Sequence, residues 1–182
     1  MKQAFAFVVL IVAIFVSFTL QEWLPGIHSF LGARWLFVPT LFCFGALTFS
    51  FPAMVALAVY TGLLTDLAYM NVAAGQVEIA LGWSIVYFVT VGILIRGFQP
   101  AYTRGHWWIL IPVSVVVTAA FLALQFAMIS LRREGLVFNE VVFWRIAGAG
   151  LLAGIFAPFV SLVVWQAGQW TGGPARQRVV LQ

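Results

Sequence analysis

The chain has 182 residues, of which 64% are hydrophobic and only 8% are charged, and its formal net charge is +4. A soluble domain carries about 25% charged residues, so this composition excludes an ordinary water-soluble fold. The basic residues stand singly or in pairs between apolar runs, which argues against nucleic-acid binding and favours contacts with lipid headgroups.

Several apolar runs approach the roughly 20 residues that a helix needs to cross the hydrocarbon core of a bilayer. The first run is longer than the apolar part of a secretory signal and lacks a cleavage site of small residues, so it reads as an uncleaved span. The pattern predicts an all-α polytopic membrane protein, a bundle of about six transmembrane helices with short connections. The expected spans are Ala4–Leu20, Trp35–Ser50, Phe51–Tyr69, Val77–Ile95, Trp108–Ser130 and Val141–Trp165.

The break between the second and third spans depends on Pro52, because a proline disfavours helical geometry at the residue before it. A five-span arrangement with one re-entrant piece stays open. Residues 1–170 are expected to form a single membrane bundle, and residues 171–182 a short mobile basic tail. With six spans both termini share a side, and a count of five Lys and Arg against four weakly favours the cytoplasm for that side.

The third predicted span contains an acid, Asp66. Such a residue costs about 2.5–3.5 kcal/mol at the centre of a span, and less here because Asp66 lies about one turn from the end. At helical spacing it shares a small and polar stripe with Ala58, Gly62, Thr65 and Tyr69. Three roles stay open: a local interfacial hydrogen bond, a buried partner contact, and binding of a ligand or proton.

Charged side chains near Asp66 suggest a buried ion pair. In the six-span arrangement Glu78 borders the same connection as Asp66, and Arg145 falls on the same side of the membrane near the start of the last span. Leaving such charges unpaired at depth is costly. We therefore expect Asp66 or Glu78 to pair with Arg145.

The last span carries small residues at helical spacing. Gly150 and Gly154 form a G-x-x-x-G motif, which lets helix backbones approach closely in lipid. The motif fits either packing within this bundle or contact with another subunit. Pro158 follows and is expected to interrupt and kink the helix.

Motifs of catalysis are lacking in this sequence. The two histidines, His28 and His106, fall in connections, and no metalloprotease, nucleophile-elbow or phosphate-loop motif occurs. Cys43 is the single cysteine, so it cannot form an intrachain disulfide. We expect no enzymatic activity, no cofactor and no metal.

The third and last spans resemble those of the rod shape-determining protein MreD family. The family pattern has a glycine followed four residues later by an aspartate, roughly G-x-L-x-D-L, and Gly62 and Asp66 occupy those places within G-L-L-T-D-L. A late Ala-Pro motif matches Ala157 and Pro158. Size and span number agree as well, so the resemblance covers most of the chain.

The resemblance implies a non-enzymatic subunit of the bacterial cell-elongation complex, which directs peptidoglycan synthesis and rod shape. It also implies an inner-membrane location with both termini cytoplasmic, and MreC, MreB, RodA and a penicillin-binding transpeptidase as direct or indirect partners. An alternative is a substrate-binding subunit similar to the S components of energy-coupling vitamin transporters, in which Asp66, Glu78 and Arg145 would line a pocket.

Overall fold

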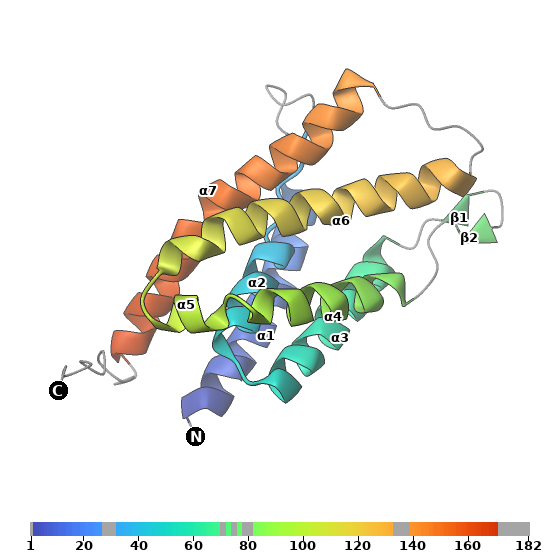
Figure 1. Cartoon of the computed structure of the whole chain (residues 1–182). Helices are drawn as coiled ribbons and strands as arrows, with labels where there is room; N and C mark the ends of the chain where they lie inside the picture. Colours follow the sequence, from blue (N-terminus) through green and yellow to red (C-terminus); the bar gives the residue numbers. More distant parts are fainter. Residues whose placement is uncertain are drawn as a thin grey trace.

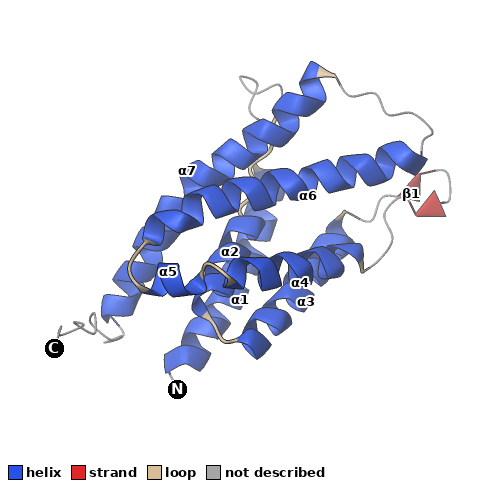
Figure 2. Ribbon diagram, viewed as in Figure 1, coloured by secondary structure: helices blue, strands red, loops and turns tan. Residues whose placement is uncertain are grey.

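The computed structural model describes residues 2–26, 32–69, 72–73, 76–77, 82–132 and 139–170. These residues form a helical bundle with one two-stranded antiparallel pair, in which Val72 lies opposite Val77 (Figure 2). The elements are α1 (Lys2–Trp23), α2 (Val38–Thr48), α3 (Phe51–Ala68), β1 (Val72–Ala73), β2 (Gln76–Val77), α4 (Trp83–Arg96), α5 (Gln99–Thr103), the 3₁₀ helix η2 (Trp107–Ile109), α6 (Leu110–Arg132) and α7 (Glu140–Trp170).

Within the described residues, four stretches are long and apolar enough to cross a membrane: Ala4–Trp23, Phe51–Ala68, Trp107–Leu131 and Glu140–Val163. The other two expected spans correspond to helices that are apolar but short. The helix expected over Trp35–Ser50 is α2, which has only 11 residues, and the helix expected from Val77 is α4, which begins at Trp83. The apolar run is longer than α2 because it begins in buried non-helical backbone at Leu36 and Phe37. Before α4, Val77 is paired in β2, and residues 78–81 lie outside the described residues.

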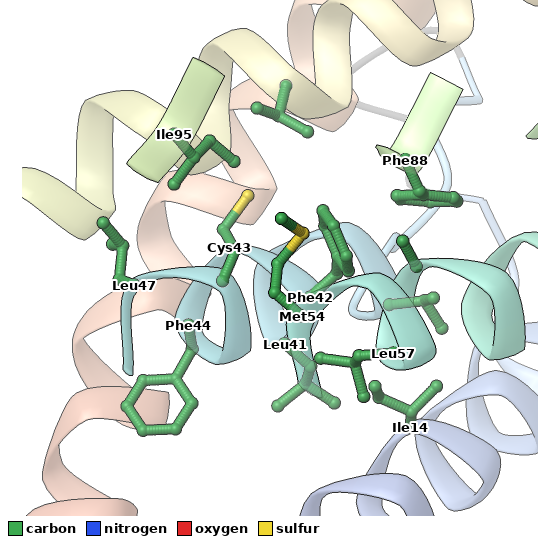
Figure 3. Packing of buried hydrophobic residues seen from close by; sticks show 14 of the residues in the cluster. Ile14, Leu41, Phe42, Cys43, Phe44, Leu47, Met54, Leu57, Phe88 and Ile95 are labelled. Atoms are coloured by element: carbon green, nitrogen blue, oxygen red, sulfur yellow. The ribbon is translucent and has the colours of Figure 1, made fainter. Parts of the chain in front are cut away.

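α2 lies at the centre of the bundle and contacts α1, α3, α4, α5, α6 and α7. Ten of its 11 residues are buried. Phe42 and Cys43 are fully buried, and Met54 and Leu57 of α3 pack beside them (Figure 3). A helix that is hydrophobic all round belongs in the interior of a bundle. This explains why the most apolar helix is also surrounded on all sides.

Prolines help to set the boundary between α2 and α3. Pro39 and Pro52 lie in the first two positions of their helices, where the missing N–H would have no partner in any case. Between the helices, Phe49 and Ser50 are extended. The tight turn expected before Pro52 is therefore present.

Two antiparallel helix pairs, α3 with α4 and α6 with α7, lie beside α2 (Figure 1). Glycines bring α7 close to α6. A Cβ added to Gly154 would lie 2.6 Å from Cγ2 of Val115, and one added to Gly150 would lie 3.0 Å from the Val115 carbonyl oxygen. The G-x-x-x-G motif thus faces a neighbouring helix of the same chain, which is one of the two roles that its sequence allows.

The first residues of α1 and the last turns of α7 lie at the same end of the bundle (Figure 1). α7 runs through Pro158 to Trp170 without a break in the helix, so the expected interruption at Pro158 is wrong. Pro158 removes one backbone donor, and neighbouring helices make such a loss tolerable in membrane bundles. The predicted basic tail at residues 171–182 lies outside the described residues.

Candidate functional site

Asp66 lies in the last turn of α3 and is 4% exposed. Its carboxylate accepts two backbone hydrogen bonds from the start of α4. The Gly82 N–H donates to Oδ2 at 2.6 Å, and the Ser84 N–H donates to Oδ1 at 3.2 Å. Both carboxylate oxygens are therefore engaged by the next helix of the bundle.

These contacts make Asp66 a helix cap supplied by another helix. The first N–H groups of any α-helix lack acceptors within the helix. Gly82, at the N-cap position of α4, has no side chain to provide one and adopts a left-handed conformation with φ of 95°. The Asp66 carboxylate takes over that role and places a negative charge at the positive end of the α4 dipole.

Gly62 allows α4 to come within reach of Asp66. A Cβ at position 62 would lie 2.5 Å from Cα and 2.6 Å from N of Ile85, and both are backbone atoms that cannot rotate away. Gly62 precedes Asp66 by four residues, so both lie on one face of α3. The glycine permits a close backbone approach, and the aspartate, one turn later, binds the helix end that this approach brings near. We call Gly62, Asp66, Gly82, Ser84 and Ile85 the α3–α4 dock.

The predicted small and polar stripe faces inward. Ala58, Gly62, Thr65 and Asp66 are buried, and Tyr69 is half-buried. Thr65 donates its hydroxyl hydrogen to the Thr61 carbonyl oxygen at 2.7 Å, one turn back in the same helix. Asp66 and Thr65 are therefore hydrogen-bonded inside the bundle, which avoids the cost of exposing them to hydrocarbon. The Thr61 hydroxyl on the same face is buried and has no hydrogen-bond partner among the described residues.

The opposite end of the α3–α4 pair is held by Arg96. Its guanidinium lies over the Phe51 ring, 5.5 Å from the centroid, and Nη1 donates to the Phe49 carbonyl oxygen at 3.3 Å. Nε2 of Gln99 donates to the same carbonyl at 3.3 Å. The two helices are thus joined near both ends, by Asp66 at one and Arg96 at the other.

Arg145 does not lie with Asp66. It is exposed at the start of α7, and its guanidinium is beside Gly32, where an added Cβ would be 3.8 Å from Nε. The structure therefore replaces the expected pair of Asp66 and Arg145 with hydrogen bonds from backbone amides, which satisfy a carboxylate without a second buried charge. The other expected acid, Glu78, lies outside the described residues.

Tyr69 ends the stripe and joins α3 to the end of α1. Nε2 of Gln21, which is buried, donates to the Tyr69 hydroxyl oxygen at 3.4 Å. Burial raises the pKa of the Tyr69 phenol above its usual value, and the negative charge of Glu22 adds to this, while Arg34 opposes it. The phenol therefore stays neutral over the physiological pH range.

The sequence reasoning missed the residues that receive Asp66 and Gly62. The tripeptide Gly82-Trp83-Ser84 before an apolar run could have indicated a helix start. Tyr87 was also missed: its hydroxyl donates to the Val117 carbonyl oxygen at 2.6 Å and ties α4 to α6. No signal in the sequence alone connects Tyr87 to a particular carbonyl on another helix.

The described part of the chain holds no group of three or more His, Cys, Asp or Glu side chains that could bind a metal ion. Comparisons of the sequence with protein-family models and curated proteins, and of the structure with solved structures, find no match.

Proposed function

We propose that this protein is a non-enzymatic inner-membrane subunit of the bacterial cell-elongation complex, similar in role to MreD. In this role it bridges MreC and other elongation proteins, directly or indirectly MreB, RodA and a penicillin-binding transpeptidase. The proposal originates in the resemblance of the Gly62–Asp66 pair to the family pattern.

The geometry of that pair is the observation that carries the proposal. Gly62 sets the α3–α4 distance at Ile85, and Asp66 caps α4 through the Gly82 and Ser84 amides. A pair of residues of this kind has a structural role, because both Gly62 and Asp66 fix the position of α4 against α3. It suits a subunit whose task is to hold a defined surface for partners in the membrane.

We further propose that α4 crosses the membrane together with α3. The stretch from Phe51 to Asp66 is about 24 Å long at about 1.5 Å per residue, and α4 measures about 21 Å by the same rule. Arg96 lies on Phe51, and Gly82 lies on Asp66. The two helices therefore match in length and in register, so they share the same depth.

The second crossing combines α2 with the residues before it. α2 is about 16 Å long, and the non-helical residues 34–37 can add up to about 13 Å. The sum approaches the roughly 30 Å thickness of the hydrocarbon core. Leu36 and Phe37 are buried, and non-helical backbone is tolerated at membrane depth where protein surrounds it. The proposed arrangement thus has six crossings, and the small excess of Lys and Arg on the side of the termini supports the cytoplasm for that side.

The alternative, a vitamin-binding subunit, would use Asp66 as a pocket residue. In the structure both Asp66 oxygens accept backbone hydrogen bonds, and Arg145 lies at Gly32. A ligand would have to compete with the α4 cap. The architectural role needs no such displacement, and for this reason we favour it.

Depletion of the protein in its host tests the proposal. Loss of rod shape with rounding is the expected result, and restoration by the wild-type gene is the control. Normal rods with impaired uptake of one vitamin would overturn the proposal in favour of the alternative.

Complementation with Asp66→Ala and Glu140→Gln sharpens the test. Asp66→Ala should restore rod shape only to the extent that the variant still folds, whereas Glu140→Gln, which removes an exposed carboxylate at the start of α7, should restore it fully. A reporter fused after Gln182 should score as cytoplasmic; an extracytoplasmic score would refute the six-span arrangement.

A further inference from the structure

The connection between α4 and α6 presents aromatic and basic side chains to the outside, at the end of the bundle where α1 begins and α7 ends (Figure 1). Phe98, Trp107 and Trp108 are 52%, 53% and 55% exposed. Arg104 and His106 are exposed between them. We call these five residues the basic–aromatic rim.

The rim is held in place by contacts on its inner side. Tyr102 packs edge-on against Phe44 of α2 with ring centroids 6.4 Å apart, and Ile109 is buried. The His106 backbone N–H donates to the Ala101 carbonyl oxygen at 3.3 Å, and its Nδ1 lies 3.1 Å from the same oxygen. The inner residues are fixed, so the outward direction of the rim follows from the fold.

Charge is distributed unevenly between the two ends of the bundle. The three acids in the described part of the chain, Glu22, Asp66 and Glu140, lie near the ends of α1 and α3 and at the start of α7, away from the rim. The sequence contains no Asp or Glu between Glu78 and Glu134, a stretch that includes the whole rim. Among the described residues, the rim end therefore carries positive charge without nearby carboxylate side chains to neutralise it.

The position of the rim indicates which surface it meets. It adjoins the apolar outer faces of α4 and α6, where Leu94 is 68% and Val116 is 65% exposed. Those side chains face hydrocarbon when the helices cross a membrane, so the rim falls at the level of the headgroups. Tryptophan settles at that level, and arginine binds phosphate oxygens through two parallel hydrogen bonds.

We propose that the basic–aromatic rim binds the headgroups of anionic phospholipids, with Arg104 as the principal phosphate contact and Trp107 and Trp108 anchored beside it. Charge complementarity supports an anionic headgroup as the ligand of the rim, because an anionic leaflet attracts basic side chains close to its surface. The rim then fixes the depth of the α4–α6 connection and keeps the end that carries the termini against the anionic leaflet. This proposal does not depend on the proposed role in cell elongation.

Lipid titration of the full-length protein tests the proposal. The purified protein, in neutral detergent, is titrated with phosphatidylglycerol or phosphatidylcholine of matched acyl chains, and bound lipids are counted by native mass spectrometry. Wild type should retain phosphatidylglycerol in preference. Arg104→Gln should weaken phosphatidylglycerol binding about fivefold, the equivalent of about 1 kcal/mol per basic residue, and leave phosphatidylcholine unchanged.

Arg34→Gln is the matched control, since it removes one exposed arginine at the opposite end of the bundle. It should leave the phosphatidylglycerol preference intact. Protection of buried Cys43 from a thiol reagent shows that each variant is folded. Equal retention of both lipids by wild type would overturn the proposal. The ligand of the rim would then be an acidic protein surface. An equal loss in both variants would overturn it as well, because charge alone would then explain binding.

Discussion

Asp66→Ala removes the carboxylate that the structure places at the start of α4, and the backbone N–H groups of Gly82 and Ser84 lose their acceptor. Each buried N–H left without a partner costs about 1–3 kcal/mol. Loss of the charge at the helix N-terminus adds about 0.3–1 kcal/mol. We expect the free energy of unfolding to fall by about 3–5 kcal/mol.

Asp66→Asn separates charge from hydrogen bonding. Its carbonyl oxygen can still accept from one amide, while its NH₂ group faces the other donor. We expect about half the loss of the alanine variant. At about 2–4 °C per kcal/mol for a chain of this size, the alanine variant should melt roughly 6–20 °C below wild type.

Labelling of Cys43 can be used to measure unfolding. It is the single cysteine of the chain and is fully buried in α2, so a fluorogenic thiol reagent reports unfolding of the bundle. The melting temperature of each variant is read from the onset of labelling in one detergent. Glu140→Gln, which removes an exposed carboxylate at the start of α7, is the control and should stay within about 1 kcal/mol of wild type. If Asp66→Ala melts with that control, Asp66 does not cap α4 in the way described.

Three further predictions use the same melting assay. Gly62→Ala should lower stability by about 1–3 kcal/mol, because its Cβ would press on the Ile85 backbone. Tyr87→Phe should lower it by about 0.5–1.5 kcal/mol, since it removes the 2.6 Å hydrogen bond to the Val117 carbonyl oxygen, which keeps its bond within α6. Because the pKa of Tyr69 is raised in the folded protein, its contribution to stability should be complete below about pH 10 and lost as the pH rises further. Tyr69→Phe should therefore reduce the alkaline fall in melting temperature measured between about pH 8 and 11.

Each of these predictions has its own contrary result. Helix propensity alone would make Gly62→Ala stabilising by about 1 kcal/mol, because alanine is the better helix former. A Gly62→Ala variant that melts at or above the wild-type temperature would therefore contradict the close contact with the Ile85 backbone. An unchanged melting temperature for Tyr87→Phe would mean that the hydrogen bond from Tyr87 to the Val117 carbonyl oxygen does not stabilise the fold. An alkaline fall of equal size with and without the Tyr69 hydroxyl would assign it to other groups.

Much of the fold could be predicted because a helix that crosses a membrane needs about 20 consecutive, mostly apolar residues. Apolar runs placed all the long helices within a few residues, and Pro52 marked the turn between α2 and α3. The inward stripe on α3 also followed from helical spacing. The length of α2 did not, because hydrophobic residues serve equally well in a helix and in buried non-helical backbone such as Leu36 and Phe37.

The candidate site was predictable only on its α3 side. Asp66 was recognisable as an acid in an apolar span, and Gly62 as a small residue on the same face. Their counterparts on α4 are backbone atoms of Gly82, Ser84 and Ile85, and every residue type except proline has an N–H to offer. A search for an oppositely charged side chain therefore led to Arg145, which lies elsewhere.

The sequence by itself indicated helices apolar enough for a membrane and located them along the chain. It also indicated that Asp66 needs a polar partner. These features depend on composition and local spacing. Only the tertiary structure decided which partner that was, how closely α3 and α4 approach at Gly62, and that α2 occupies the centre. Such contacts join residues 16 or more positions apart, and their geometry is set by how whole helices pack.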